Sequence, residues 1–227
     1  GKNDNGNNGR TELVFVVDRS GSMGGLESDT IGGFNSMLSK QRTIAGECRV
    51  TTLLFDHRIE TLHNHLDIRE VNDLTSRDYW VRGSTALLDA IGLAIDRMIV
   101  TQRHTAAAYR AQHVLFVIIT DGYENASRRY SLHQIKQMIT YERERYHWEF
   151  VFLGANIDAE QTAGDFGISP RCATDFHADG QGIKASFEAV ACAATAVRGG
   201  ADLEDLNAPD FLGGVRDDYR SRRRMKR

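Results

Sequence analysis

Five oxygen-bearing side chains stand at spacings that suit the binding of a hard metal ion. Asp18, Ser20 and Ser22 alternate along a short glycine-containing stretch, so their side chains can converge on one point. Thr85 and Asp121 follow much later in the chain, each in a short polar segment. Carboxylate and hydroxyl oxygens are the ligands that Mg²⁺ prefers, in octahedral geometry and with some of its waters retained. These residue types predict a magnesium site, provided that the fold brings the three segments together.

The apolar pattern places both aspartates at the ends of buried strands. Residues 13–17 and 114–119 are continuous apolar runs rich in β-branched residues, typical of strands buried on both faces. Asp18 directly follows the first run, and Asp121 comes two residues after the second. In open α/β sheets, ligands bind at the carboxyl ends of the strands. We therefore expect Asp18 and Asp121 to lie at the same edge of one sheet.

The remaining segments alternate between helical and extended patterns. This order predicts an α/β fold, a Rossmann-like three-layer sandwich whose central, mostly parallel sheet has one antiparallel edge strand and helices on both faces. In the hairpin, His63 and His65 are expected to point to the same solvated face. The predicted helices lie around residues 31–38, 86–100, 132–139, 159–166 and 182–197, the hairpin over 50–55 and 58–66, and further strands at 150–153 and 172–176.

Composition divides the chain into three segments. Residues 1–10 hold no apolar side chain and are predicted to be a disordered lead or linker. Residues 11–198 are predicted to form one domain, and residues 199–227 a C-terminal extension that ends in a basic tail, expected to be solvated and frayed. The formal net charge of −3 becomes −10 for residues 11–219, once the six cations of residues 220–227 and the +1 of the lead are set aside. An acidic body argues against nucleic-acid binding across its surface, whereas RNA, an anionic membrane and an acidic protein all stay open as partners of the tail.

Hydropathy and cysteine content predict the cellular compartment of the protein. The longest apolar run, Val114 to Ile119, has six residues, far short of the ~20 needed to cross a bilayer. No apolar segment typical of a secretory signal follows the first residue. The three cysteines are far apart and odd in number, which is typical neither of a disulfide framework nor of a zinc cluster. We therefore expect a cytoplasmic protein with no membrane span.

The complete motif resembles the metal-ion-dependent adhesion site of von Willebrand factor A domains. The order of elements from about residue 11 to 198 is also similar to that family, most of all to its short, free-standing bacterial members. The resemblance implies a non-catalytic, magnesium-dependent protein-interaction module. The matching segments are Asp18-x-Ser20-x-Ser22, Thr85 within Gly-Ser-Thr-Ala-Leu, and Thr120-Asp121-Gly122.

The resemblance also implies a role for each residue of the motif. Ser20, Ser22 and Thr85 would bind the ion through their hydroxyls, with Mn²⁺ or Ca²⁺ as alternative occupants. Asp18 and Asp121 would hold it partly through bridging water. The sixth position would be left for an Asp or Glu of a partner protein, and an adaptor role beside an AAA+ type machine is the refinement that the resemblance offers.

Five neighbouring residues are candidates for supporting the ion or lining the partner groove: Arg19, Gly21, Ser84, Asp89 and Glu124. Ser84 or Thr85 is also suited simply to cap the helix that follows. Asp89 either supports the ion from one turn into that helix or complements the helix dipole.

The principal alternative is a metal-dependent phosphoester hydrolase, because one magnesium ion and two carboxylates can activate water. Arg19 and Arg82 flank the motif and could stabilise a phosphate. However, no His or Lys falls in the same loops as Asp18, Thr85 or Asp121 to act as a base. A nucleotide-binding loop is disfavoured, because the glycines after Asp18 do not have the Gly-x-Gly-x-x-Gly spacing.

Overall fold

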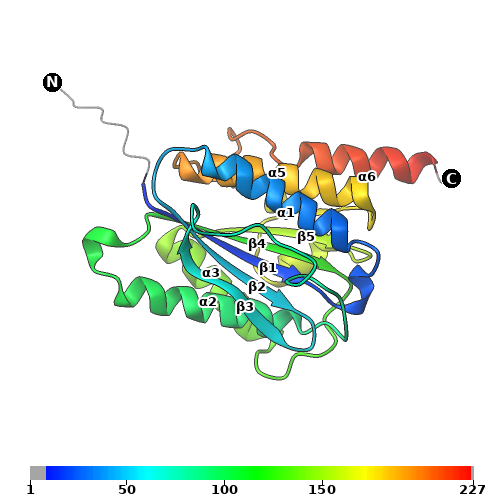
Figure 1. The fold of residues 1–227 in the computed structure, drawn as a ribbon, viewed down its shortest axis with the longest axis horizontal. Coiled ribbons are helices and arrows are strands. Elements are labelled where there is room, and N and C mark those ends of the chain that lie inside the picture. Colours follow the sequence, from blue (N-terminus) through cyan, green and yellow to red (C-terminus); the bar gives the residue numbers. More distant parts are fainter. Residues whose placement is uncertain (1–8, 226–227) are drawn as a thin grey trace.

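The computed structural model describes residues 9–225, so most of the predicted lead at residues 1–10 lies outside the described part. The strands are β1 (Thr11–Asp18), β2 (Cys48–Phe55), β3 (Ile59–Asp67), β4 (His113–Asp121), β5 (Glu149–Ala155) and β6 (Ala173–Asp175). They form one sheet in the order β3-β2-β1-β4-β5-β6 (Figure 1). Neighbouring strands are parallel except for β2 and β3, which are antiparallel.

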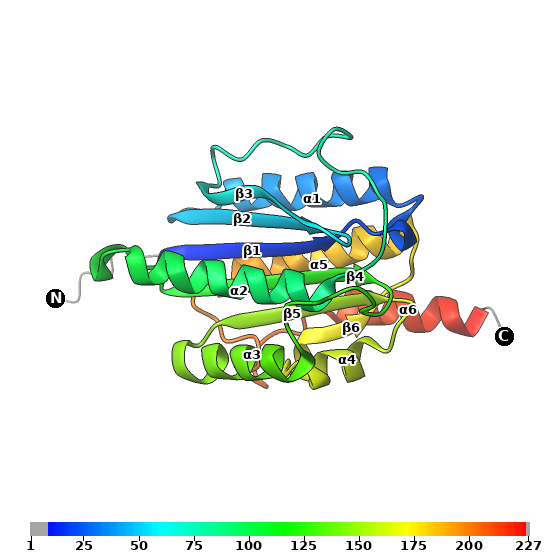
Figure 2. The ribbon, with the colours of Figure 1, turned by 90° about the horizontal axis from the view of Figure 1, so that it is seen from below.

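Helices cover both faces of the sheet. They are α1 (Glu27–Arg42), α2 (Leu87–His104), α3 (Leu132–Tyr146), α4 (Ala159–Asp165), α5 (Gly180–Arg198) and α6 (Gly213–Met225), with short 3₁₀ turns η1 (Gly21–Met23), η2 (Ala107–Tyr109) and η3 (Pro170–Cys172). The pair α1 and α5 lies on one face, and α2 and α3 lie on the other (Figures 1 and 2). The predicted three-layer sandwich with one antiparallel edge strand is therefore confirmed.

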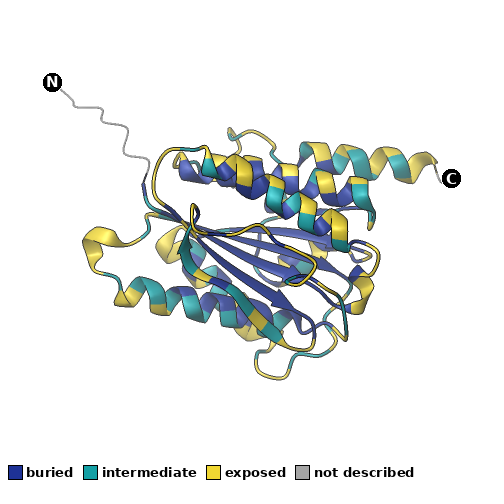
Figure 3. Ribbon diagram, viewed as in Figure 1, coloured by how far each residue is buried: buried dark blue, intermediate teal, exposed yellow. Residues whose placement is uncertain are grey.

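The central strands are buried because their side chains are apolar on both faces. Every residue of β1 is buried, and only the first residue of β4 and of β5 is partly exposed (Figure 3). Parallel pairing sets Val17 of β1 opposite Ile119 of β4. The loops after these two strands therefore begin side by side, as the sequence predicts for Asp18 and Asp121.

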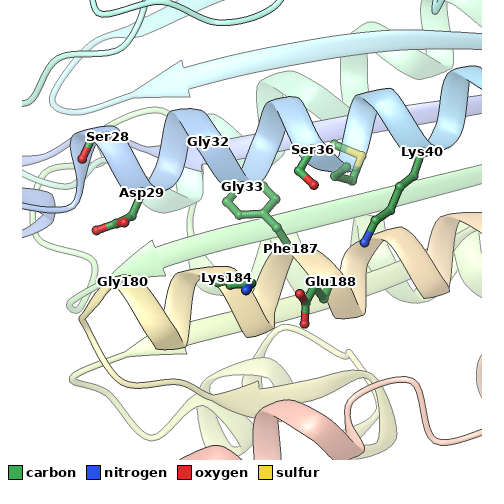
Figure 4. A pocket seen from close by; sticks show the side chains of 11 residues that line it. Ser28, Asp29, Gly32, Gly33, Ser36, Lys40, Gly180, Lys184, Phe187 and Glu188 are labelled. Atoms are coloured by element: carbon green, nitrogen blue, oxygen red, sulfur yellow. The ribbon is translucent and has the colours of Figure 1, made fainter.

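One close approach between α1 and α5 requires a glycine. A Cβ atom at Gly33 of α1 would lie only 2.4 Å from the ring of Phe187 on α5. Figure 4 shows the Phe187 ring beneath this part of α1, on the wall of a surface cavity between the two helices. A larger side chain at position 33 would have to push the helices apart.

The expectation that His63 and His65 share a solvated face is wrong. The hairpin register pairs Thr52 with His63 and Val50 with Leu66, so β3 carries one extra residue there, and His65 takes a left-handed φ of 54°. Such a bulge breaks the alternation of side chains along a strand. His63 is buried beside Phe34 and hydrogen-bonds Thr52 Oγ1, whereas His65 pairs with Glu12.

The expectation of a frayed C-terminus is also wrong for the described residues. Helix α6 runs to Met225 and packs against α5 and β6. Its one buried residue is Val215, and its sequence is otherwise strongly polar. Tertiary contacts rather than an apolar stripe therefore hold this helix, which explains why hydropathy alone did not predict it.

Candidate metal site at the carboxyl edge of the sheet

Asp18 is fully buried at the end of β1, and neutral donors hold its carboxylate. Oδ1 accepts a hydrogen bond from the backbone N–H of Ser20 at 2.7 Å. Oδ2 accepts one from the Thr120 hydroxyl at 2.8 Å and one from the Asp121 N–H at 3.1 Å. Residues at the end of β4 thus fix the carboxylate at the end of β1.

The two serines of the first loop bring their hydroxyls together. The 3₁₀ turn η1 folds the loop so that Ser20 Oγ and Ser22 Oγ lie 3.0 Å apart. The Ser22 hydroxyl also donates to the backbone carbonyl of Asp121. Adjacent ligands of an octahedral Mg²⁺, each ~2.1 Å from the ion, are themselves ~3.0 Å apart. The observed spacing is therefore suitable for a shared ion.

Backbone hydrogen bonds join the segment that carries Thr85 to the first loop. Gly21 N–H donates to the Gly83 carbonyl at 3.0 Å, and Arg82 N–H donates to the Arg19 carbonyl at 2.9 Å. Thr85 is buried at the end of this segment. The N-cap of α2 is Ala86, without a side-chain capping bond, so neither Ser84 nor Thr85 caps that helix.

Two asparagines outside the five-residue motif complete the framework. Asn125 clamps Thr85 from both sides, since its Oδ1 accepts the Thr85 N–H at 2.8 Å and its own N–H donates to the Thr85 carbonyl at 3.0 Å. Asn156 Nδ2 donates to Asp121 Oδ1 at 2.7 Å. Asn156 directly follows β5 with a left-handed φ of 55°, a conformation that Asn tolerates better than most residues. In the sequence, the one indication of this role was the position of Asn156 directly after a buried strand.

The electrostatics at this edge favour a bound cation. Burial raises the pKa of Asp18, against the hydrogen bonds that stabilise its charge. Burial also raises the pKa of Asp121, opposed by the Asn156 hydrogen bond and reinforced by repulsion from Asp18. Within residues 9–225, no Lys or Arg forms an ion pair with either carboxylate. The donor set of two carboxylates and three hydroxyls therefore fits a hard divalent ion.

The five neighbouring candidates have varied surroundings. Gly21 and Ser84 are exposed on the two joined loops. Asp89 accepts the backbone N–H groups of residues 128–130, and Glu124 accepts those of Leu88, Ala126 and Ser127. Both acids thus shape the loop between β4 and α3, a role that neither interpretation of Asp89 anticipated.

Arg19 and Arg82 are committed to other partners. The Arg19 guanidinium is buried and pairs with Asp56 at 3.4 Å and with Glu60 at 2.7 Å. Arg82 also pairs with Asp56, at 2.9 Å, and both guanidinium groups lie over the Trp80 ring. Acidic side chains of the β2–β3 hairpin thus already pair with both charges, which are not left free for a phosphate.

His57 lies nearer to the site than its sequence position indicated. A Cβ atom at Gly83 would lie 2.2 Å from His57 Nδ1, so the imidazole packs against the segment that carries Thr85. His57 Nδ1 lies 3.3 Å from Asp56 Oδ1. The hairpin turn therefore supplies a histidine that the sequence analysis had not associated with these loops.

Among residues 9–225, no helix combines the length and apolar character needed to cross a membrane. In the same range, no group of three or more His, Cys, Asp or Glu side chains is arranged to hold a metal ion. The candidate site has only two carboxylates, so it depends on hydroxyl donors that such a group does not include.

Comparison with known proteins identifies the fold. No family model and no curated protein match the sequence. The von Willebrand factor domain of the type V pili tip protein Mfa5 from Porphyromonas gingivalis matches with a TM-score of 0.58 and 11% identity, over 82% of this chain and 95% of that one. Proximal thread matrix protein 1 from the mussel byssus, with a zinc-occupied MIDAS motif, matches with a TM-score of 0.54 and 12% identity, over 82% of this chain and 46% of that one.

A von Willebrand factor type A structure from Catenulispora acidiphila matches with a TM-score of 0.53 and 10% identity, over 81% of this chain and 42% of that one. This chain thus spans less than half the length of the mussel and Catenulispora structures. At these identities the likeness establishes the fold and leaves function to the site itself.

Proposed function

We propose that this chain, which has the fold of von Willebrand factor A domains, is a metal-dependent protein-interaction module. Ser20, Ser22 and Thr85 would hold a divalent ion through their hydroxyls, and Asp18 and Asp121 would neutralise it. When bound, the ion supplies an electrophilic centre with few anionic ligands, which attracts an incoming carboxylate. The partner would be a protein that presents an Asp or Glu side chain.

One observation carries this proposal. Two buried aspartates meet at the ends of β1 and β4, and the groups that hydrogen-bond them are neutral. Buried carboxylates without a cationic partner are costly unless a positive charge joins them. The paired serine hydroxyls, 3.0 Å apart, offer further ligands beside them.

Magnesium is the ion that the oxygen donors favour, with Mn²⁺ and Ca²⁺ as the alternatives. The mussel structure carries zinc in its motif, so the identity of the ion here has to be measured. The cytoplasmic location and the adaptor role beside an AAA+ type machine stay predictions from the sequence.

The experiment is a metal titration of the EDTA-treated full chain, followed by a carboxylate titration. Isothermal calorimetry with Mg²⁺ and Mn²⁺ should give one site in the wild type. Ser22→Ala should weaken binding about tenfold, by removing one ligand, while Ser39→Ala on the exposed side of α1 should leave it unchanged. A peptide with one Asp in a Gly/Ser background should then bind only when metal is present, and its Asn counterpart should not bind.

Two outcomes would contradict the proposal. One is peptide binding that survives EDTA and the Asp121→Asn substitution. The other is turnover of a phosphoester such as p-nitrophenyl phosphate that Asp121→Asn abolishes, since this would favour the hydrolase.

A further inference from the structure

Helix α6 carries two sets of arginines with different surroundings. Arg216 and Arg222 anchor the helix to the domain. Arg222 pairs with Asp179 and Asp218, which ties the end of α6 to the start of α5. Arg216 binds Asp210 at 2.9 Å and the carbonyls of Pro170, Arg171 and Ala173 at 3.0, 3.2 and 3.1 Å.

The second set consists of Arg220, Arg223 and Arg224, which are exposed. They stand at helix positions i, i+3 and i+4 and therefore share one side of α6. Among the described residues, no acidic side chain pairs with any of the three. A helix that is firmly anchored thus presents cations that the domain itself does not neutralise.

Two of these cations share a cavity with the segment that follows β5. Arg220 and Arg223 line a cavity of about 460 Å³ whose other wall includes Ile157 and Asp158. Ile157 directly follows Asn156, the residue that hydrogen-bonds Asp121. Figure 2 shows α6 running toward the same edge of the sheet at which the strands β1, β4 and β5 end. A segment of a partner protein bound at the metal beside Asp121 could therefore continue past Asn156 to α6.

We propose that Arg220 and Arg223 bind further acidic side chains of the partner protein whose carboxylate binds the metal. This inference rests on the proposed function, and it names the partner as an acidic segment rather than a lone Asp or Glu. The unpaired cations of α6 complement such a segment.

The charges around the cavity favour a protein over a nucleic acid. Asp158, Glu160 and Asp175 line the cavity opposite the arginines. Residues 11–219 together carry a formal charge of −10. A nucleic acid carries a charge on every phosphate and would be repelled along most of this surface, whereas a protein segment can place its carboxylates at the metal and at α6 and uncharged residues beside these three acids.

The test compares two peptides on the full chain by fluorescence anisotropy. One peptide has a single Asp in a Gly/Ser background, and the other has the same Asp followed by a run of Glu. With Mg²⁺ at low ionic strength, the acidic peptide should bind more tightly. The Arg220→Glu/Arg223→Glu variant should lose about fivefold or more of the acidic peptide's affinity, and the affinity for Mg²⁺ and for the single-Asp peptide should not change.

The matched control is Lys136→Glu/Arg145→Glu, which reverses two exposed charges on α3 and should behave as the wild type. If the acidic peptide binds without any dependence on Mg²⁺ and the α6 reversal still weakens it, the metal function fails and the α6 contact stands. If binding depends on Mg²⁺ and the α6 reversal has no effect, the inference about α6 fails alone. Tighter binding of poly-uridine RNA than of the acidic peptide, lost in the α6 reversal, would also overturn it.

Discussion

Strand β1 carries a buried acid near each end, and the two acids have different surroundings. Asp18 at the carboxyl end is 0% exposed, and Glu12 at the other end is 3% exposed. Asp18 receives three hydrogen bonds from two N–H groups and a hydroxyl. Glu12 Oε1 lies 2.6 Å from His65 Nδ1, while its buried Oε2 has no hydrogen-bond partner among the described residues.

The difference shows that burial alone does not define a metal site. Burial raises the pKa of both acids. At Asp18, several hydrogen bonds oppose this effect and stabilise the charged form. At Glu12, the opposing influence is the charge of Arg49, and the pKa reaches about 8. The hydrogen bonds at the carboxyl edge therefore favour the charged form of Asp18 that a cation requires, whereas the opposite edge holds an acid that keeps its proton at neutral pH.

The largest expected effect is on metal affinity. Asp18→Asn keeps the shape of the side chain but removes a negative charge beside the ion, so Mn²⁺ binding should weaken about 100-fold. Glu12→Gln removes a carboxyl of similar burial and should leave Mn²⁺ binding unchanged. Isothermal calorimetry measures both affinities, and circular dichroism should show that both variants remain folded. Equal losses in the two variants would mean that Asp18 acts through the stability of β1.

The position of Asp18 could be predicted from the sequence, because it depends only on where a strand ends. The apolar runs before Asp18 and Asp121 were sufficient to place both residues at one edge of the sheet, because parallel strands align their carboxyl ends. The hydrogen bonds from Asn125 and Asn156 could not be predicted, because each joins segments that only the folded chain brings together.

The surroundings of Glu12 were equally beyond prediction. Glu12 precedes an apolar run and appears in the sequence as an ordinary polar residue at a strand start. Its contact with His65 depends on the extra residue in β3, which turns His65 toward Glu12 and away from the face of His63. Helix α6 was missed for a related reason, since an arginine bonded to carbonyls, as Arg216 is, leaves no hydrophobic pattern.

The second prediction concerns stability and pH. The pKa of Glu12 rises from 4.5 to about 8 in the folded state, so its contribution to stability is fully present below about pH 4.5 and is lost as pH rises through 8. Glu12→Gln should remove this loss and raise the free energy of unfolding at pH 9, relative to the wild type, by about 3–5 kcal/mol. Urea denaturation at pH 6 and pH 9 measures the effect.

The control for this prediction is Glu47→Gln, which removes an exposed acid paired with Arg10. It should change stability by less than about 1 kcal/mol at either pH. Burial lowers the pKa of His65, so its own contribution is lost as pH falls, in the direction opposite to that of Glu12. A Glu12→Gln variant whose stability follows the wild type between pH 6 and 9 would show that Glu12 is ionised throughout.

The smallest expected effect tests how closely the carboxyl edge depends on its hydrogen bonds. Asn156→Gly keeps the left-handed backbone conformation, with φ of 55°, and removes only the amide that binds Asp121. Since the hydrogen bonds that orient a metal ligand are typically worth about tenfold in metal affinity, Mn²⁺ should bind about tenfold more weakly. The exposed Asn207→Gly is the matched control and should bind as the wild type. An unchanged affinity in Asn156→Gly would mean that the bonds around Asp18 suffice to order the site, and that the edge is defined by β1 and β4 without help from β5.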